Sequence, residues 1–253
     1  MHGTTQSPRP RIAVILAAGK GTRLQSELPK VLHEAGGRPL LSWVLDAARA
    51  AGCARLVVVV GHKADEVRAA LAAPDVTWVL QAEQRGTGHA LAQVMPEISG
   101  PATLLVLSGD VPLLTPATLE SLAAEAERGW GALAVAELES PGSLGRVIPR
   151  ADRSDRLARL VEARDASPEE LRVTTVNAGI YALPAPEIYP YLEALQPNNA
   201  QGELYLTDAL AAAAAQHELV IHRLADPTEA LGVNDRAELA AVDRLLSART
   251  AIR

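Results

Sequence analysis

The chain has 253 residues, 48% of them apolar, and a formal net charge of −6 at pH 7. This length can bury a substantial core in one large α/β domain or two small ones. The acidic balance argues against a nucleic-acid groove, the absence of an apolar run of about 18 residues argues against a membrane span, and the single cysteine excludes an internal disulfide. Because the first residues lack the apolar stretch of a signal peptide, we expect a soluble cytoplasmic protein.

The first half of the chain alternates between strand-like and helical stretches. Uninterrupted apolar runs predict strands, and Thr115 with Pro116 after it is a typical helix start. The alternation predicts right-handed βαβ units and a mostly parallel sheet. Strands are expected at 12–18, 56–60, 76–80 and 103–107, and helices at 40–51, 64–72, from 88 and at 116–128.

The second half of the chain is less regular. No internal repeat, low-complexity linker or charge run divides it into two domains. We therefore predict a doubly wound, mostly parallel α/β sheet with a small antiparallel extension in the second half. Strands are expected at 131–138, 145–149, 157–161, 173–183 and 219–224. Helices are expected from near 201–204 to about 216 and at 235–248.

Polar or glycine residues follow each strand of the first half. Ligands of open α/β sheets bind beyond the carboxyl ends of the strands, so these residues predict a ligand site at that edge. They are Gly19–Arg23, Gly61–His62, Gln81 and Gly109–Asp110.

The stretch LAAGKGTRL at 16–24 has the composition of a phosphate-binding turn. It lacks the third glycine of a dinucleotide fingerprint, and no glycine stands at the P-loop spacing before Gly19-Lys20. What remains is a backbone nest in which Lys20, Arg23 and Lys30 could neutralise a polyphosphate. A glycine turn with solvated cations is the alternative. The sequence has 21 arginines and only three lysines, and two of these lysines flank the turn.

Further motifs carry a resemblance that extends over nearly the whole chain, in order. They are QAEQRGTGHA at 81–90, SGDVPLL at 108–114, LGRV at 144–147, LVEARDA at 160–166, NAGIYAL at 177–183, NNAQGELYLTD at 198–208 and GVNDR at 232–236. With LAAGKGTRL, the chain resembles the sugar-phosphate nucleotidyltransferases of Rossmann-like fold. Within them it is most similar to the pyrophosphorylase domain of bacterial N-acetylglucosamine-1-phosphate uridyltransferases.

The resemblance implies a nucleotide site in which Arg23 and Lys30 act catalytically by neutralising the phosphates and the leaving pyrophosphate. The amide of Gln81 carries both a donor and an acceptor, which suits the edge of uracil. Gly86 and Thr87 would complete the base pocket. The implied nucleotide-binding residues are Leu16, Ala17, Ala18, Gly19, Lys30, Gln81, Gly86, Thr87, Ser108, Gly109 and Asp110.

The resemblance also implies a magnesium ion and a sugar pocket. Asp110 and Asn234 would hold Mg²⁺, which needs only one or two protein oxygens beside phosphates and water. Without the resemblance, the residue type of Glu162 favours a surface salt bridge with Arg159 or Arg164. The implied sugar-binding residues are Gly145, Glu162, Asn177 and Asn234.

The implied reaction is transfer of the uridylyl group of UTP to N-acetylglucosamine-1-phosphate, with release of pyrophosphate. Arg164 and Ala178 stand where relatives often carry Lys and Thr. These two departures leave open a related sugar-1-phosphate uridylyl- or thymidylyltransferase. A non-catalytic nucleotide-sugar-binding relative is a further alternative.

The expected organisation is one domain over residues 1–253. Its nucleotide-binding half spans about 11–112, its sugar-binding half about 113–234 and a final helix about 235–250. Relatives continue into a left-handed β-helix acetyltransferase domain that forms trimers, and the sequence contains no hexapeptide repeat of that kind. We therefore expect a monomer without acetyltransferase activity, and neither nucleic acid nor membrane as a partner.

Overall fold

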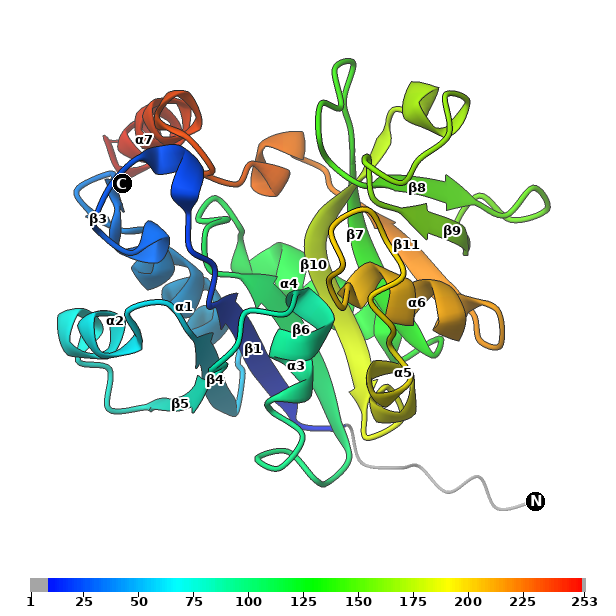
Figure 1. Ribbon diagram of the computed structural model, residues 1–253, viewed down its shortest axis with the longest axis horizontal. Helices are drawn as coiled ribbons and strands as arrows, with labels where there is room; N and C mark the ends of the chain where they lie inside the picture. Colours follow the sequence, from blue (N-terminus) through cyan, green and yellow to red (C-terminus); the bar gives the residue numbers. More distant parts are fainter. Residues whose placement is uncertain (1–8, 252–253) are drawn as a thin grey trace.

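A single large sheet runs through the middle of the molecule (Figure 1). The computed structural model describes residues 9–251. Among these, seven strands follow one another across the sheet in the order β11-β7-β10-β6-β1-β4-β5, and β8 and β9 extend it beside β10. The strands are β1 (Arg11–Ala17), β4 (Arg55–Val60), β5 (Val76–Leu80), β6 (Ala102–Ser108), β7 (Gly131–Glu137), β8 (Arg146–Pro149), β9 (Leu157–Val161), β10 (Thr175–Ala185) and β11 (Leu219–Arg223).

The strand directions divide the sheet into two regions. Strands β6, β1, β4 and β5 are all parallel, and so are β7 and β11. Strand β10 lies between β6 and β7 and is antiparallel to both, while β8 and β9 pair antiparallel. The prediction of a mostly parallel sheet with an antiparallel extension is therefore confirmed.

Seven α-helices and four short 3-10 helices accompany the sheet among the described residues. Thr115 Oγ1 accepts a hydrogen bond from Thr118 N, which caps α4 as its sequence predicts. The α-helices are α1 (Leu40–Ala50), α2 (Ala64–Leu71), α3 (Thr87–Ala92), α4 (Pro116–Ala126), α5 (Tyr189–Glu193), α6 (Leu206–Ala214) and α7 (Arg236–Ala251). The 3-10 helices are η1 (Thr22–Leu24), η2 (Lys30–Leu32), η3 (Glu170–Arg172) and η4 (Pro227–Ala230), and a small hairpin joins β2 (Glu34–Ala35) to β3 (Arg38–Pro39).

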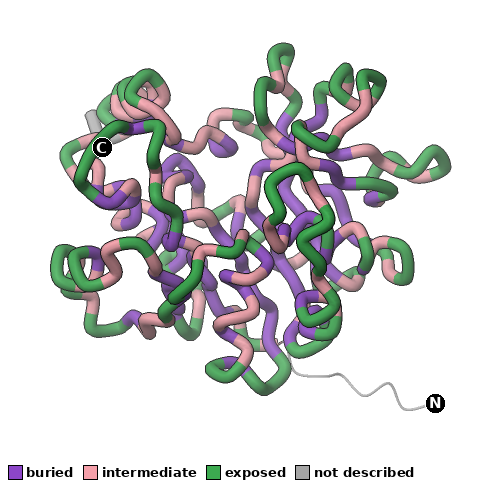
Figure 2. Tube along the Cα trace, viewed as in Figure 1, coloured by how far each residue is buried: buried purple, intermediate pink, exposed green. Residues whose placement is uncertain are grey.

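Apolar side chains are buried on both faces of the sheet, as the purple strands of Figure 2 show. One core packs α1 and α4 on one face, and a second packs α3, α5 and α6 on the other. Alternate valines of β4 belong to different cores: Val58 to the first and Val59 to the second, both with no exposed surface. A third cluster lies under α7 and joins Val242 and Leu246 to Leu24. Burial of such a side chain contributes about 1.5–3 kcal/mol to folding, so the layers hold the strand ends in fixed positions.

One predicted element begins later than expected. The helix predicted to begin near 201–204 begins at Leu206, because the preceding segment is held in an irregular loop. Asn199 Oδ1 accepts hydrogen bonds from the backbone N–H groups of Gln201 and Glu203. These two N–H groups therefore have a partner without forming a helix. No helix of the described residues is long and apolar enough to cross a membrane.

Candidate active site

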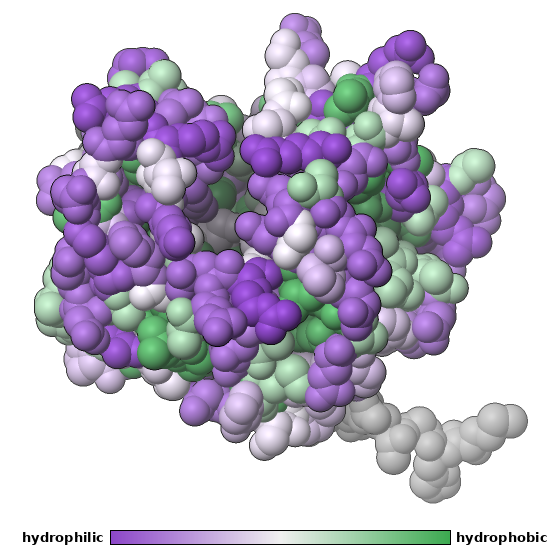
Figure 3. All heavy atoms as spheres, viewed as in Figure 1, coloured by the Kyte–Doolittle hydropathy of each residue, from purple (hydrophilic) through white to green (hydrophobic). Residues whose placement is uncertain are grey.

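Two adjoining pockets lie along the edge of the sheet at which the parallel strands end, as the sequence predicts. Their volumes are about 530 Å³ and about 500 Å³. Figure 3 shows a hollow near the middle of the visible face, rimmed largely by hydrophilic residues. Leu16, Thr87, Ser108 and Asp110 line both pockets, so the two form one continuous site.

The smaller pocket, here called the nucleotide pocket, gathers most of the residues predicted to bind a nucleotide. Gly109 is the exception: it lies behind the pocket, and its N–H donates to the carbonyl of Leu16 at 2.9 Å. Arg23 lines neither pocket and is exposed on η1. The predicted residues that do line the nucleotide pocket are Leu16, Ala17, Ala18, Gly19, Lys30, Gln81, Gly86, Thr87, Ser108 and Asp110.

The glycine turn after β1 lies directly against Lys30. Gly21 has a φ of 61°, in the left-handed region that favours glycine. A Cβ at Gly21 would stand 2.7 Å from the Cβ of Lys30, closer than such atoms approach one another. The turn therefore needs glycine at this position both for its conformation and for the approach of the lysine stem.

The ammonium of Lys30 lies between Asp110 and Asn234. It forms an ion pair with Asp110 and donates a hydrogen bond to Asn234 Oδ1 at 2.8 Å. Val233 N donates to the carbonyl of Asp110 at 3.0 Å, and Asn234 N donates to Glu238 Oε2 at 2.6 Å. These bonds hold two oxygen donors from distant parts of the chain around one cation.

These donors fit a hard divalent metal ion. The carboxylate of Asp110 and the amide oxygen of Asn234 already converge on the Lys30 ammonium, which stands in for a cation. Among residues 9–251 no group of three or more His, Cys, Asp or Glu side chains could hold a metal. Two protein oxygens of this kind are a donor set that Mg²⁺ can use, because it completes its coordination with phosphates and water.

The base end of the nucleotide pocket centres on Gln81, which is 2% exposed. Its Nε2 donates to the carbonyl of Gly86 at 3.1 Å and lies 3.0 Å from His89 Nδ1. Gln84 Nε2 donates to the backbone carbonyl of Gln81 at 2.9 Å. The Gln81 side chain is thus held by its own loop and by the first turns of α3.

The larger pocket, here called the sugar pocket, contains all four residues predicted to bind the sugar. Glu162 Oε1 accepts a hydrogen bond from Thr207 Oγ1 at 3.0 Å. Burial raises the pKa of the Glu162 carboxyl, and the nearby carboxylates of Asp208, Asp165 and Glu203 raise it further. Glu162 is therefore a buried acceptor rather than a surface salt-bridge partner.

Asn177 is fixed on both sides of its amide. Its Nδ2 donates to Tyr181 Oη at 2.7 Å, and its Oδ1 accepts from Gly179 N at 3.1 Å. Its backbone N–H donates to the carbonyl of Gly145 at 2.9 Å. The nearby Arg146 is 3% exposed and binds the carbonyls of Leu144 and Gly142, which shapes the loop that leads into Gly145.

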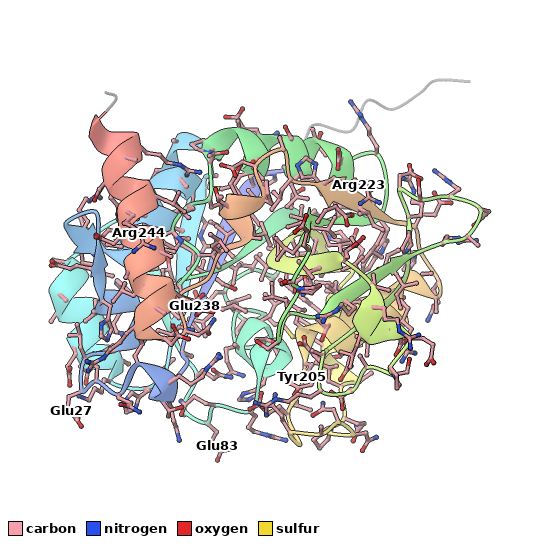
Figure 4. The ribbon with its side chains drawn as sticks, turned by 90° about the horizontal axis from the view of Figure 1, so that it is seen from above. Glu27, Glu83, Tyr205, Arg223, Glu238 and Arg244 are labelled. Carbon is pink, nitrogen blue, oxygen red and sulfur yellow. The ribbon has the colours of Figure 1, made fainter. Side chains whose placement is uncertain are left out.

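Several site residues were not predicted from the sequence. In the sugar pocket they include Tyr181, Thr207 and Glu238, and in the nucleotide pocket Gln84 and Glu203. Figure 4 shows Glu238 on the first turn of α7 and Tyr205 just before α6. All of these residues except Glu238 lie within motifs quoted above, so the motifs carried a signal that was not assigned to single residues. Tyr181 stands inside a strand, where an aromatic residue is usually part of the core.

The two departures from the resemblance have different surroundings. Ala178 is buried and lines the sugar pocket. Arg164 is exposed and donates to Gln201 Oε1 at 2.8 Å, so it ties the loop before α6 to the strand end after β9.

The sequence and structure were compared with known proteins. Residues 13–196 match the family described as the MobA-like NTP transferase domain. The bifunctional protein GlmU of Burkholderia orbicola is 48% identical over 233 residues, which are 92% of this chain and 51% of that protein. GlmU of Burkholderia mallei is 49% identical over 234 residues, with the same coverage. The chain thus spans about half the length of the curated relatives that it matches.

Solved structures share the fold at low sequence identity. A UDP-glucose pyrophosphorylase in complex with UDP-glucose has a TM-score of 0.77 at 19% identity, with 96% of this chain and 100% of that chain covered. A nucleotidyl transferase from Methanothermobacter has a TM-score of 0.67 at 22% identity, with 95% and 99% covered.

Proposed function

Because the chain belongs to the MobA-like NTP transferase domain family, and so is a nucleotidyltransferase, we propose that it transfers the uridylyl group of UTP to N-acetylglucosamine-1-phosphate. The products would be UDP-N-acetylglucosamine and pyrophosphate. The identity of 48–49% with the first half of GlmU supports these substrates over others.

The observation that carries the proposal is the junction of the two pockets. Ser108 and Asp110, at the end of β6, line both of them. A nucleotide in one pocket and a sugar phosphate in the other would therefore bring their phosphates together beside Asp110. Holding two reactants in this way lowers the entropic part of the barrier.

The chemistry needs no general base from the protein. The attacking oxygen belongs to a phosphate, which is already an anion, and its line of attack lies opposite the leaving pyrophosphate. The protein supplies positioning and positive charge, as in phosphoryl transfer generally. Lys30, and the backbone N–H groups of the Gly19–Gly21 turn, would neutralise the triphosphate. The exposed Arg23 could reach the departing pyrophosphate only from outside the pocket.

Asp110 and Asn234 would hold Mg²⁺, which would neutralise phosphate charge when bound. The ammonium of Lys30 lies between the same two oxygens. Lys30 would therefore turn from Asp110 and Asn234 toward the phosphates when the substrates bind. This exchange keeps the charge of Asp110 compensated both with and without substrates.

The sugar pocket offers side chains that match hydroxyl and N-acetyl groups. The Glu162 carboxylate accepts hydrogen bonds from hydroxyls, and the amide of Asn177 retains one N–H beyond its bond to Tyr181. The buried methyl group of Ala178 adds an apolar wall.

A steady-state assay of four substrate pairs tests the proposal. N-acetylglucosamine-1-phosphate and glucose-1-phosphate are each combined with UTP and with dTTP, and pyrophosphate release is measured with Mg²⁺ and after chelation by EDTA. We expect the pair of UTP and N-acetylglucosamine-1-phosphate to have the highest kcat/KM, and EDTA to abolish turnover.

Each other outcome has a definite meaning. A higher kcat/KM with glucose-1-phosphate or dTTP would make the chain a related uridylyl- or thymidylyltransferase. Binding of UDP-N-acetylglucosamine without any pyrophosphate release would make it a non-catalytic relative and contradict the proposal.

A further inference from the structure

His89 lies beside the base pocket, and the reaction described above gives it no task. It lies on α3 and lines neither pocket. Its ring contacts the side chain of Gln81, the one buried amide side chain of the nucleotide pocket. That amide carries an oxygen acceptor and a nitrogen with two hydrogens. Which of the two atoms faces the ligand decides what the pocket can recognise.

The surroundings of Gln81 leave only one orientation of its amide. The backbone carbonyl of Gly86 can only accept a hydrogen bond, so the atom 3.1 Å from it must be Nε2. The second hydrogen of Nε2 then points to His89 Nδ1 at 3.0 Å, so this ring nitrogen carries no proton and accepts. An amide turned by 180° would set its oxygen against the carbonyl oxygen of Gly86, so that two acceptors would face each other.

The oxygen of the same amide remains for a ligand. Gln81 Oε1 accepts no hydrogen bond from the residues that the structure describes, while Gln81 itself lines the nucleotide pocket. Gln81 Oε1 is not one of the fully buried polar atoms that lack a partner, so it is open to the pocket and can accept from a ligand donor.

His89 is itself held in position. The carbonyl of His89 accepts from Gln93 Nε2 at 3.1 Å, and Gly88 N donates to the carbonyl of Leu204 at 2.8 Å. The helix that carries the histidine is therefore anchored both along its own length and to the loop before α6.

We propose that His89 is a positioning residue that holds the Gln81 amide with its oxygen toward the base, and so makes the pocket select uracil or thymine over cytosine. Uracil and thymine present an N–H at N3, which donates to Gln81 Oε1. Cytosine presents a lone pair at N3, which faces that oxygen as a second acceptor. The inference rests on the proposed function in one respect, that the nucleotide is a pyrimidine.

The test compares histidine variants by their preference for UTP over CTP. His89→Lys offers only donors and favours the turned amide, whereas His89→Asn keeps an acceptor oxygen close to the position of Nδ1. We expect the ratio of kcat/KM for UTP to that for CTP to fall by at least about tenfold in His89→Lys and to stay within about threefold of the wild type in His89→Asn. Binding of dTTP should weaken together with that of UTP, because the two share the N3 edge.

His62→Lys is the matched control. His62 is exposed and lines neither pocket, and the same substitution there adds the same charge without a contact to Gln81. Its UTP-to-CTP ratio should equal that of the wild type. If His89→Lys does not fold, His89→Leu replaces it, with an expected fall of about threefold or more.

Calorimetric Kd values of UTP and CTP, measured without sugar phosphate, separate this inference from the proposed function. A wild-type protein that prefers UTP while both His89→Lys and His89→Leu keep that preference would overturn the role of His89 alone. A wild-type protein that binds both nucleotides equally would overturn the orientation of the Gln81 amide and with it the role of His89, whereas a protein that binds neither would overturn the pyrimidine assignment. Absence of turnover with N-acetylglucosamine-1-phosphate, with the expected change in Kd values, would contradict the sugar assignment and support His89.

Discussion

The nucleotide pocket and the sugar pocket are built by different means. The nucleotide pocket follows the ends of parallel strands, and its lining includes Gly19, Gly21 and Gly86, with Lys30 as a half-buried cation. The sugar pocket collects side chains such as Glu162, Asn177 and Thr207 from separate antiparallel and helical segments. The first arrangement suits the phosphates common to all nucleotides, and the second can be changed residue by residue. A family built in this way can keep its nucleotide chemistry while its sugar differs.

Lys30→Ala alters the nucleotide pocket, and it should have the largest effect on turnover. Removal of the ammonium leaves triphosphate charge uncompensated, so we expect kcat to fall at least tenfold, which corresponds to about 1.4 kcal/mol of barrier. Pyrophosphate release in steady state measures it. Lys63→Ala is the control, because Lys63 pairs with Glu27 at 3.5 Å outside both pockets and should leave kcat unchanged. Near-normal turnover of Lys30→Ala would remove Lys30 from the mechanism.

Glu162→Gln alters the sugar pocket. Gln keeps the hydrogen bond from Thr207 but loses the charge that strengthens bonds to hydroxyls, so we expect the KM for the sugar phosphate to rise about tenfold with a smaller change in kcat. A rise in the KM for UTP of equal size would contradict the division between the two pockets.

The same variant should be more stable than the wild type at neutral pH. Burial raises the pKa of Glu162 in the folded protein, so between the unfolded and folded pKa values the native state binds more protons. Stability of the wild type therefore falls as pH rises through that window, and Glu162→Gln escapes this loss. The difference in melting temperature should be present at about pH 8 and absent below about pH 4, where the carboxyl is protonated in both states. A variant less stable than the wild type at about pH 8 would show that the charge stabilises the fold.

Gly21→Ala should have the smallest effect, and it tests whether the glycine turn acts through Lys30. Gly52→Ala is the matched control: its φ is 73° against 61° at Gly21, but a Cβ there would meet open space. Each substitution should destabilise the fold by about 1–2 kcal/mol through backbone strain. Only Gly21→Ala displaces Lys30, so only it should lower kcat, by about threefold or more. Equal kcat values would mean that Lys30 does not depend on the turn.

Much of the fold could be predicted because local signals and burial agree. The valines of β4 are buried on both faces, and Thr115 with Pro116 starts α4 as expected. The helix predicted to begin near 201–204 starts only at Leu206, because the side chain of Asn199 accepts hydrogen bonds from the backbone N–H groups of Gln201 and Glu203. Such competition depends on contacts that no local pattern of hydrophobic residues records. The insertion of β10 between β6 and β7 was likewise beyond the sequence, since strand order depends on pairing across the whole chain.

The candidate site was predictable where spacing carries the chemistry. The turn after β1, Gln81 and Asp110 follow strand ends, and each lines a pocket or lies beside it. Asn234 and the sugar residues came only from the resemblance, because distance along the chain hides their proximity. Arg23 is exposed and lines neither pocket, so its catalytic role stays a prediction.

Strand β10 has a mechanical consequence. It pairs with β6 on one edge and with β7 on the other, and it carries Asn177 into the sugar pocket two positions before Gly179, whose carbonyl accepts from Ser108 Oγ at 3.5 Å. A rotation of the two halves about a hinge would have to disturb the pairing of β10 with β6 along Tyr181–Ala185 and with β7 on either side of the irregularity between Asn177 and Tyr181. The paired strands on both sides of β10 therefore hold the floor beneath the two pockets in a fixed position.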